Sequence, residues 1–341
     1  MSVLLVTGGS QGIGAAVVRL AAAKGFVVAF TYSRNAAPAE ALVAEVKAAG
    51  GEAHAFKADA ADEAATIAAF EQIDRLGPLV ALTVAAEATT DLKVGSLVFG
   101  NDYRHPVVLA KEIATLDLMS EGRVEFGLGA GWMTSDYEQS GMTNDPAGVR
   151  ITRMAESLTV MKSLWSTGAC TFEGEHYQIT GAIGAPLPHH RPHPPIIIGG
   201  GGKRVLGIAA READIVGVNP SLAAGYVGPE VLETTTAEYY DERIGWIREA
   251  AGERFADLEL QVLTFVVQIV PDREDATARL AQMMSVTAEQ VDGSPIALIG
   301  TVEQIIERLV ERRARFGFSY VVVHEAEMEA FAPVVAALAG T

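Results

Sequence analysis

The feature that most constrains the fold of this chain is a repeated alternation of short apolar runs with amphipathic segments. Apolar runs of about four to eight residues are typical of buried strands, and apolar residues recurring every three to four positions are typical of helices. Strands that alternate with helices form parallel sheets, because each helix carries the chain back to the start of the next strand. The alternation therefore predicts an α/β fold.

The pattern predicts nine strands, three before Gly77 and six after it. A (β/α)8 barrel closes with eight strands, so the chain has one more than a barrel needs. The expected strands cover residues 3–7, 27–32, 53–58, 92–99, 124–128, 195–198, 214–218, 258–269 and 320–324. The expected helices cover residues 13–24, 38–49, 64–75, 106–119, 151–165, 203–211, 237–251 and 302–316. The segment Cys170–Pro194 interrupts the alternation and predicts a hairpin followed by a loop.

Composition excludes several classes of function. The 341 residues include 26 Lys and Arg against 43 Asp and Glu, a formal net charge of −17 that disfavours nucleic acids and anionic membranes as partners. A single cysteine, Cys170, excludes an intramolecular disulfide and a cysteine-based zinc cluster. No run approaches the roughly 20 apolar residues of a membrane-spanning helix. We therefore expect a soluble cytoplasmic protein that acts on small molecules, and a homodimer is a possible assembly.

A first glycine motif lies between the first expected strand and the helix after it, in the sequence Thr7-Gly8-Gly9-Ser10-Gln11-Gly12-Ile13-Gly14. Glycines allow close approach of the backbone, so that free N–H groups at a positive helix end can bind phosphate oxygens. Gly8, Gly12, Ile13 and Gly14 are therefore candidates for binding a nucleotide. The alternative is that the glycines only form a tight turn.

Two further glycine motifs follow later strands. Gly199, Gly200, Gly201 and Gly202 end a strand and precede a helix that begins with Lys203 and Arg204, which predicts a phosphate site. Ala130 and Gly131 follow another strand, where small residues would let a flat ring lie against the backbone. Trp132 is then either a wall of this cavity or an ordinary core residue.

Residues 1–77 resemble the beginning of a short-chain dehydrogenase/reductase, whose glycine signature is Thr-Gly-x-x-x-Gly-x-Gly. The resemblance includes Arg34 in Tyr32-Ser33-Arg34-Asn35, a basic residue that implies acceptance of the NADP 2′-phosphate. Asp59 stands near the aspartate with which that family contacts adenine. The catalytic Tyr-x-x-x-Lys pair of the family is absent from the chain, so NADP binding is implied without dehydrogenase chemistry.

Residues 78–341 resemble the luciferase-like oxidoreductases, which are (β/α)8 barrels that use flavin or deazaflavin. The resemblance rests on Ser120-Glu121-Gly122-Arg123, on Phe126-Gly127-Leu128-Gly129-Ala130-Gly131-Trp132, on Phe172-Glu173-Gly174-Glu175-His176-Tyr177 and on Ile198-Gly199-Gly200-Gly201-Gly202. It implies coenzyme F420 as cofactor, with FMN as the alternative. It also implies a non-prolyl cis peptide between Ser96 and Leu97, behind the cofactor ring.

The luciferase-like part begins at the third strand of its family, so its own first two strands are missing. The Asp or His that deazaflavin enzymes carry at the second strand is therefore not assigned, and Trp132 stands where one branch has a Glu. Trp132 and His324, which ends the last expected strand, are the only catalytic candidates. We expect the dehydrogenase-like strands to replace the missing barrel strands, which would bring Gly8–Gly14 and Gly199–Gly202 to the same end of one barrel.

These observations predict a TIM-barrel-like α/β oxidoreductase with segments 1–77 and 78–341. It would transfer hydride between F420 or FMN and a small organic substrate. Two alternatives stay open: an NADP-dependent binder of the short-chain dehydrogenase type, and a catalytically impaired fusion. No metal site is expected, because His189, His190 and His193 lie in a proline-rich loop without the spacing of metal ligands.

Overall fold

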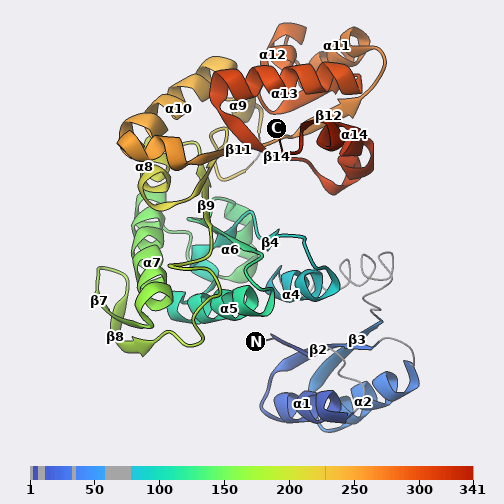
Figure 1. Cartoon of the computed structure of the whole chain (residues 1–341), viewed down its shortest axis with the longest axis vertical. Helices are drawn as coiled ribbons and strands as arrows, with labels where there is room; N and C mark the ends of the chain where they lie inside the picture. Colours follow the sequence, from blue (N-terminus) through green and yellow to red (C-terminus); the bar gives the residue numbers. More distant parts are fainter. Residues whose placement is uncertain (1–2, 7–11, 33–35, 58–77, 227, 341) are drawn as a thin grey trace.

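A computed structural model of the chain describes residues 3–6, 12–32, 36–57, 78–226 and 228–340. The first elements form a parallel three-stranded sheet with two helices, as the sequence predicts (blue in Figure 1). They are β1 Val3–Val6, α1 Gly12–Ala23, β2 Val27–Tyr32, α2 Ala36–Ala48 and β3 Glu52–Lys57. The strand order is β1-β2-β3. The helix expected over 64–75 lies outside the described residues.

This small sheet has a hydrophobic core of its own. Val18 of α1, Val28 and Phe30 of β2, and Leu42 of α2 are almost completely buried in it. At the surface, Arg19 donates two hydrogen bonds of 2.7 and 2.9 Å from α1 to the carboxylate of Glu45 on α2. The helices are therefore held against the sheet and against each other by contacts within the segment.

The larger part of the chain is organised around a curled parallel sheet (Figure 1). Its strands are β4 Val94–Gly95, β5 Phe99–Gly100, β6 Val124–Gly129, β9 Ile196–Gly200, β10 Ile215–Val218, β11 Glu259–Leu263 and β14 Phe318–Val322. The order is β14-β11-β10-β9-β6-β4, and β5 also pairs with β6. Strands that follow one another in the chain are neighbours in the sheet, as in a (β/α)8 barrel. The predicted α/β, barrel-like fold class is confirmed.

The expectation that the first three strands pair with this sheet is wrong for the described residues. β1, β2 and β3 form a separate sheet, and their core is separate from the main core. The physical reason is a helix that the sequence analysis missed, α4 Pro78–Ala88, which contacts β1 as well as β4 and helix α5 Pro106–Met119. A helix, rather than a strand ladder, therefore connects the two sheets.

Arg123 holds α4 against the main sheet. Its guanidinium donates hydrogen bonds to the carbonyl of Ala86 at 2.6 Å, to the hydroxyl of Thr89 at 3.1 Å and to the carbonyl of Leu92 at 2.8 Å. The last carbonyls of a helix lack partners within the helix and lie at its negative end, so a cation is favoured there. The Ser-x-Gly-Arg motif of this chain thus has a structural role.

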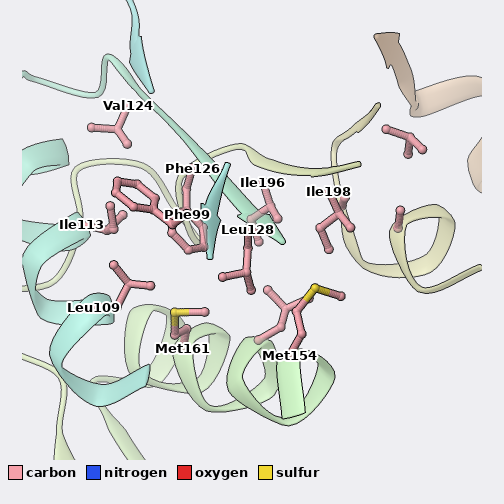
Figure 2. Close-up of a cluster of buried hydrophobic side chains, with 14 of the residues drawn as sticks. Phe99, Leu109, Ile113, Val124, Phe126, Leu128, Met154, Met161, Ile196 and Ile198 are labelled. Atoms are coloured by element: carbon pink, nitrogen blue, oxygen red, sulfur yellow. The ribbon is translucent and has the colours of Figure 1, made fainter. Parts of the chain in front are cut away.

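Helices cover the outer face of the main sheet and bury its apolar side chains. These helices are α5, α7 Ala147–Thr167, α8 Lys203–Glu212, α10 Ala237–Ala251 and α13 Val302–Phe316. The bounds of α5, α10 and α13 are those predicted. Figure 2 shows how the helix-facing side chains of the strands meet those of α5 and α7: Phe99, Phe126, Leu128, Ile196 and Ile198 pack against Leu109, Ile113, Met154 and Met161.

The opposite, concave face of the sheet carries a polar bridge. Because side chains alternate along a strand and Val124 and Phe126 face the helices, Glu125 points into the curl. Its carboxylate accepts hydrogen bonds from Tyr320 Oη of β14 at 3.0 Å and from Lys93 Nζ at 2.7 Å. Burial and the Glu125 charge raise the pKa of Tyr320, so its hydroxyl stays protonated and able to donate.

The predicted excursion at 170–194 is an antiparallel hairpin, β7 Ala169–Glu173 and β8 Gln178–Ile183. Its turn is held by Glu156 of α7, whose carboxylate accepts backbone hydrogen bonds of 2.8 to 3.1 Å from Glu175, His176 and Tyr177. These bonds lower the pKa of Glu156 against the opposing effect of burial. The Phe-Glu-Gly-Glu-His-Tyr motif therefore forms the turn of this hairpin.

Two expected strands are interrupted in the structure. Residues 92–99 contain only the short strands β4 and β5, separated by Ser96, Leu97 and Val98. Residues 258–269 are divided between β11 and β12 Val266–Ile269, because Thr264 donates its N–H to Val322 of β14 whereas Val266 donates to Ile296. β12 pairs in parallel with β13 Ala297–Gly300 in a separate two-stranded sheet.

Additional helices complete the described chain. They are α6 Thr134–Ser140, α9 Pro229–Leu232, α11 Arg273–Met284, α12 Ala288–Gly293 and α14 Met328–Leu338, with short 3-10 turns at Asn101–Tyr103, Gly252–Asp257 and Glu325–Glu327. None of the described helices has the length and apolar character needed to cross a membrane.

Replacing Tyr320 with Phe removes the hydroxyl that bridges the curl and leaves the buried Glu125 carboxylate with one partner fewer. We expect a loss of about 1.5–3 kcal/mol in the free energy of unfolding, the usual contribution of a hydrogen bond to a charged group. Urea denaturation checks this, with Tyr226→Phe at an exposed position as the matched control. Equal stability of Tyr320→Phe and wild type would contradict a stabilising role of the bridge.

Candidate functional site

The carboxyl ends of the parallel strands of the main sheet lie at one edge, where the loops to the following helices begin. Three of the predicted groups lie at this edge: Ser96 and Leu97 after β4, Ala130 and Gly131 after β6, and Gly199–Lys203 at the end of β9 and the start of α8. Because β4, β6 and β9 are adjacent in the sheet, the fold brings these groups together. The sequence analysis placed them separately.

Four glycines form one level across four neighbouring strands. Gly100 of β5 pairs with Gly129 of β6, and Gly199 of β9 pairs with Gly217 of β10. The level below consists of Phe99, Leu128, Ile198 and Val216, of which Leu128 and Ile198 are paired, so Gly129 and Gly199 come next to each other. Those apolar residues face the helices, so the glycines face the concave side. We call Gly100, Gly129, Gly199 and Gly217 the glycine level.

The side chains around the glycine level come from neighbouring elements. A Cβ atom placed on Gly199 would lie 3.0 Å from Asn219 Nδ2, and one on Gly217 would lie 2.9 Å from Gln261 Oε1. On Gly129 it would meet Val98 at 2.5 Å, and on Gly100 the ring of Tyr103 at 2.8 Å. Gln261 is 3% exposed. The glycines carry no side chains of their own, and the side chains of two carboxamide residues and two apolar residues lie against them from neighbouring elements.

The segment Ser96-Leu97-Val98 lies directly against β6. A Cβ atom on Gly127 would stand 1.9 Å from the Ser96 carbonyl oxygen, so glycine is required where this segment crosses the strand. The non-prolyl cis peptide is present but joins Leu97 to Val98, one residue later than the Ser96–Leu97 bond that the resemblance implied. Leu97 is 44% exposed at the edge of the site.

Gly131 accommodates a tyrosine of the protein. Its φ of +75° favours glycine, and a Cβ atom there would lie 2.0 Å from Tyr137 Oη. Tyr137 is 2% exposed and donates a 3.0 Å hydrogen bond to Asp102, which also accepts one of 2.9 Å from Arg153. The space that the sequence analysis assigned to a flat ring at Gly131 is therefore partly filled by Tyr137.

The loop Gly200–Lys203 combines exposed backbone with a cation. Gly202 precedes the first turn of α8 and has no side chain to cap it. Lys203 is largely exposed and lies 3.6 Å from Glu249, also exposed. Arg204 turns away from the loop, because its guanidinium donates to the Gly148 carbonyl and the Thr152 hydroxyl at 2.7 Å each. Of the two cations predicted at this helix start, Lys203 stays largely exposed beside the loop, with Glu249 as its ion-pair partner.

The two catalytic candidates of the sequence analysis lie at the same edge. Trp132 directly follows Gly131 and is half-buried. His324 follows β14, is exposed, and its ring centre lies 6.5 Å from that of Phe265. The structure thus places both at the carboxyl ends of strands, and their catalytic role stays a prediction.

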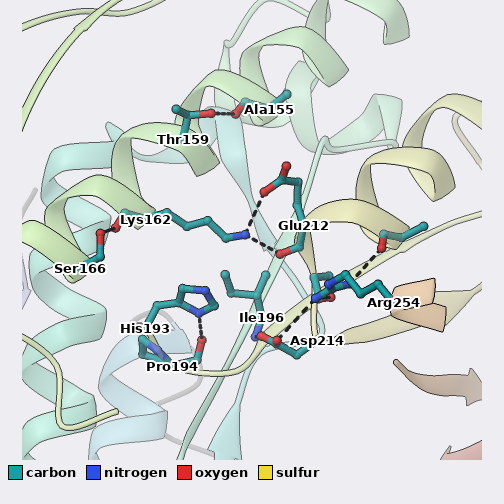
Figure 3. A network of polar contacts seen from close by, with 12 residues as sticks. Ala155, Thr159, Lys162, Ser166, His193, Pro194, Ile196, Glu212, Asp214 and Arg254 are labelled. Carbon is teal, nitrogen blue, oxygen red and sulfur yellow. Dashed lines mark hydrogen bonds and ion pairs between the residues drawn. The ribbon is translucent and has the colours of Figure 1, made fainter. Parts of the chain in front are cut away.

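The histidines of the proline-rich loop attach it to the barrel. His190 donates its backbone N–H to the fully buried carboxylate of Asp117 at 2.8 Å, and its Nδ1 lies 2.9 Å from the same carboxylate. His193 Nδ1 donates to the Pro194 carbonyl at 2.9 Å, and Asp214 accepts the N–H of Ile196 at 2.8 Å where β9 begins (Figure 3). These contacts account for the His cluster as an anchor for the start of β9.

The nucleotide motif of the first segment is only partly described. Gly12, Ile13 and Gly14 open α1 directly after the connection from β1. Gly8, Arg34 and Asp59 lie outside the described residues. The expectation that Gly8–Gly14 and Gly199–Gly202 share one barrel end required β1 to pair with the main sheet. β1 belongs to a separate sheet, so this premise is wrong.

Sequence reasoning missed Gly100, Gly217, Asn219 and Gln261. Gly217 and Asn219 stand in Val216-Gly217-Val218-Asn219, at the end of an expected strand, which could have marked them as residues at the carboxyl edge. Gln261 interrupts an apolar strand with a polar residue, which is also a usable signal. Gly100 carries no local signal, because only the strand register assigns it to the glycine level.

A curled parallel sheet with helices outside and a row of glycines at its carboxyl edge defines a barrel-type α/β protein. Comparison with known proteins makes this specific. The profile of the luciferase-like monooxygenase family matches residues 60–287, and that of the short-chain dehydrogenases matches residues 2–96. The chain belongs to the luciferase-like monooxygenase family.

Relatives and solved structures agree with this assignment. An uncharacterized protein of Mycobacterium tuberculosis is 30% identical over 241 residues, covering 70% of this chain and 77% of the relative. The FMNH2-dependent dimethylsulfone monooxygenase of Pseudomonas putida is 24% identical over 247 residues, covering 67% of this chain and 68% of the relative. The coenzyme F420-dependent tetrahydromethanopterin reductase of Methanopyrus kandleri has a similar fold, with a TM-score of 0.60 at 16% identity over 99% of this chain and 97% of that chain.

Replacing Gly131 with Ala tests how tightly Tyr137 fills this corner. Gly141 provides a matched control, since its φ of +69° imposes the same backbone strain with nothing within 4 Å of an added Cβ. We expect Gly141→Ala to lose about 1–2 kcal/mol of unfolding free energy, and Gly131→Ala to lose about 1–3 kcal/mol more from overpacking. Chemical denaturation measures both, and equal losses would show that Tyr137 moves away without cost.

Proposed function

We propose that this chain binds the deazaflavin coenzyme F420 at the carboxyl end of its main sheet and transfers hydride between the coenzyme ring and a small organic substrate. The observation that carries the proposal is the glycine level, which spans four adjacent strands and faces the concave side. Glycines let a ring and the side chains around it lie close to the strand backbone. F420-dependent and FMNH2-dependent relatives within the family support a cofactor of the flavin type.

The residues around the glycine level fit such a cofactor. The carboxamides of Asn219 and Gln261 border the level at Gly199 and Gly217, where they can donate to and accept from the polar edge of a deazaflavin or flavin ring. The Gly200–Lys203 loop offers backbone N–H groups at the positive end of α8, together with the Lys203 ammonium, for a phosphate. FMN presents the same ring edge and phosphate and is the alternative cofactor.

The loops around the level favour an apolar substrate. Leu97, Tyr103, Tyr226 and Phe265 are between 40% and 57% exposed, and each lies in a connection that follows the carboxyl end of a strand. Exposed apolar side chains at the mouth of a cofactor site are typical of sites for small organic molecules. A bound deazaflavin or flavin supplies the hydride chemistry, and the chain supplies binding, orientation and exclusion of water.

A second candidate is NADP binding by the first segment. The βαβαβ arrangement of β1 to β3, with Gly12–Gly14 opening α1, is the observation that favours it. No Tyr-x-x-x-Lys pair accompanies it in the sequence, so this candidate is a nucleotide-binding function without dehydrogenase chemistry.

Fluorescence titration of the purified protein with F420, FMN and NADPH in parallel separates these functions. Tight binding of F420 supports the proposal, and binding of FMN in place of F420 supports the alternative cofactor. Binding of NADPH alone would favour the second candidate and refute the first. Binding of none of the three would indicate a catalytically impaired fusion.

Replacing Gly217 with Ala adds a methyl group to the glycine level at a position where the fold can accept it. The methyl meets only the end of the flexible Gln261 side chain at 2.9 Å and the Gly199 backbone at 3.3 Å. We expect roughly tenfold weaker binding of the coenzyme that wild type binds, a change of about 1.4 kcal/mol. Gly245→Ala, with nothing within 4 Å of the added Cβ, is the control and should bind as wild type does. Unchanged binding by Gly217→Ala would place the ring elsewhere.

A further inference from the structure

We propose that Arg243 and Tyr239 of α10 are positioning residues of the phosphate loop, which orient the backbone N–H groups of Gly201 and Gly202 toward the ligand. This inference rests on the proposed function, because it assigns a phosphate to Gly200–Lys203. It concerns residues that lie on another helix, outside every motif of the sequence analysis.

Both side chains bind the same carbonyl group. The Gly201 oxygen accepts hydrogen bonds from Tyr239 Oη at 3.3 Å and from Arg243 Nε at 3.2 Å. Burial raises the pKa of Tyr239, so its hydroxyl remains a donor across the neutral range. Two donors from α10 therefore fix the direction of the peptide between Gly201 and Gly202.

The orientation of the N–H groups follows from peptide geometry. In a trans peptide the C=O and the N–H point in opposite directions, so the Gly202 N–H points away from α10. The preceding carbonyl, that of Gly200, accepts the N–H of Asn219 at 3.0 Å, which directs the Gly201 N–H away from β10. The N–H groups of Gly201 and Gly202 therefore both point away from α10 and β10, next to the start of α8.

The side of the loop that faces Tyr239 is closed to a ligand. A Cβ atom on Gly201 would lie 2.7 Å from the Asn219 carbonyl, 2.8 Å from the Pro220 carbonyl and 2.8 Å from Tyr239 Oη. Carbonyl oxygens would also repel an anion there. A phosphate must approach from the other side, toward which the N–H groups are turned.

Arg243 is itself held by aromatic rings. Its guanidinium carbon lies 3.3 Å from the centre of the Tyr239 ring and 4.4 Å from that of Trp246, residues four before and three after it on α10. Such spacing puts all three side chains on one face of the helix. Arg243 also pairs with Glu242 and is 14% exposed. Lys203 Nζ lies 5.9 Å from the Trp246 ring, so the same stack is adjacent to the exposed cation of the loop.

The test compares each coenzyme with its phosphate-free form; FMN and riboflavin differ only in the phosphate, and F420 differs from its deazaflavin nucleoside in the phosphate and the side chain that the phosphate carries. Wild type, Arg243→Lys, Tyr239→Phe and the control Arg248→Ala are titrated with F420 and its phosphate-free deazaflavin nucleoside, and with FMN and riboflavin. Arg248 of the same helix is the control. Its guanidinium carbon also lies over an aromatic ring, 4.5 Å from the centre of Phe255, but away from the loop. Unfolding midpoints in urea show that each variant is folded.

We expect Arg243→Lys to bind the phosphate-bearing coenzyme about five- to tenfold more weakly, and Tyr239→Phe about threefold, the range of a single lost hydrogen bond. Binding of the phosphate-free form should change less than twofold in both, and Arg248→Ala should match wild type. Equal weakening for both forms, or no weakening, would overturn the inference, since a purely structural contact would not distinguish the phosphate.

Failure of the proposed function is recognised separately. If wild type binds neither F420 nor FMN, the proposed function has failed, and the melting temperature is then measured with and without inorganic phosphate. A phosphate-dependent increase in wild type that is lost in Arg243→Lys and kept in Arg248→Ala upholds the positioning role. No increase in wild type, or the same increase in Arg243→Lys, overturns it.

Discussion

The hydrogen bond between Glu125 and Tyr320 depends on a strongly curled sheet, and the position of the site depends on the same curl. Tyr320 lies on β14 and Glu125 on β6, which are four steps apart in the strand order. Neighbouring strands are about 4.8 Å apart, so a flat sheet would separate the two strands by roughly 19 Å. Two parallel side chains on a flat face could not then approach to 3.0 Å. The curl that permits this contact also turns the glycines at the carboxyl edge toward a common concave space.

The curled main sheet positions the candidate site by itself, because β1, β2 and β3 form a separate sheet and do not pair with it. The glycine level uses only β5, β6, β9 and β10, which are consecutive in the sheet and share one core with α5 and α7. The phosphate loop is held by α8, by the backbone of Asn219 and by α10, all within the same part of the chain. The first sheet has a core of its own and meets the main sheet through α4. The proposed cofactor binding and the proposed nucleotide binding can therefore be tested one by one.

Local signals explain which elements the sequence predicted well. Helix α5 begins at Pro106 after a capping His105, and α13 begins with a complete capping box of Thr301 and Gln304, so their bounds followed from the sequence. Strand pairing is not local. The division of 258–269 depends on which carbonyl, Val322 or Ile296, accepts each N–H, and the separation of the two sheets depends on α4. In the site, Gly199–Lys203 followed from sequence, whereas Gly100 joined the glycine level only through its register with Gly129.

The polar groups that border the glycine level constrain the chemistry that the site can perform. Asn219 and Gln261 carry carboxamides, which donate and accept hydrogen bonds but do not exchange protons at neutral pH. Glu125 lies further toward the amino ends of the strands and is engaged by Tyr320 and Lys93, whose own pKa is raised by this contact. A reaction here would depend on orientation of the cofactor and substrate over the glycine level.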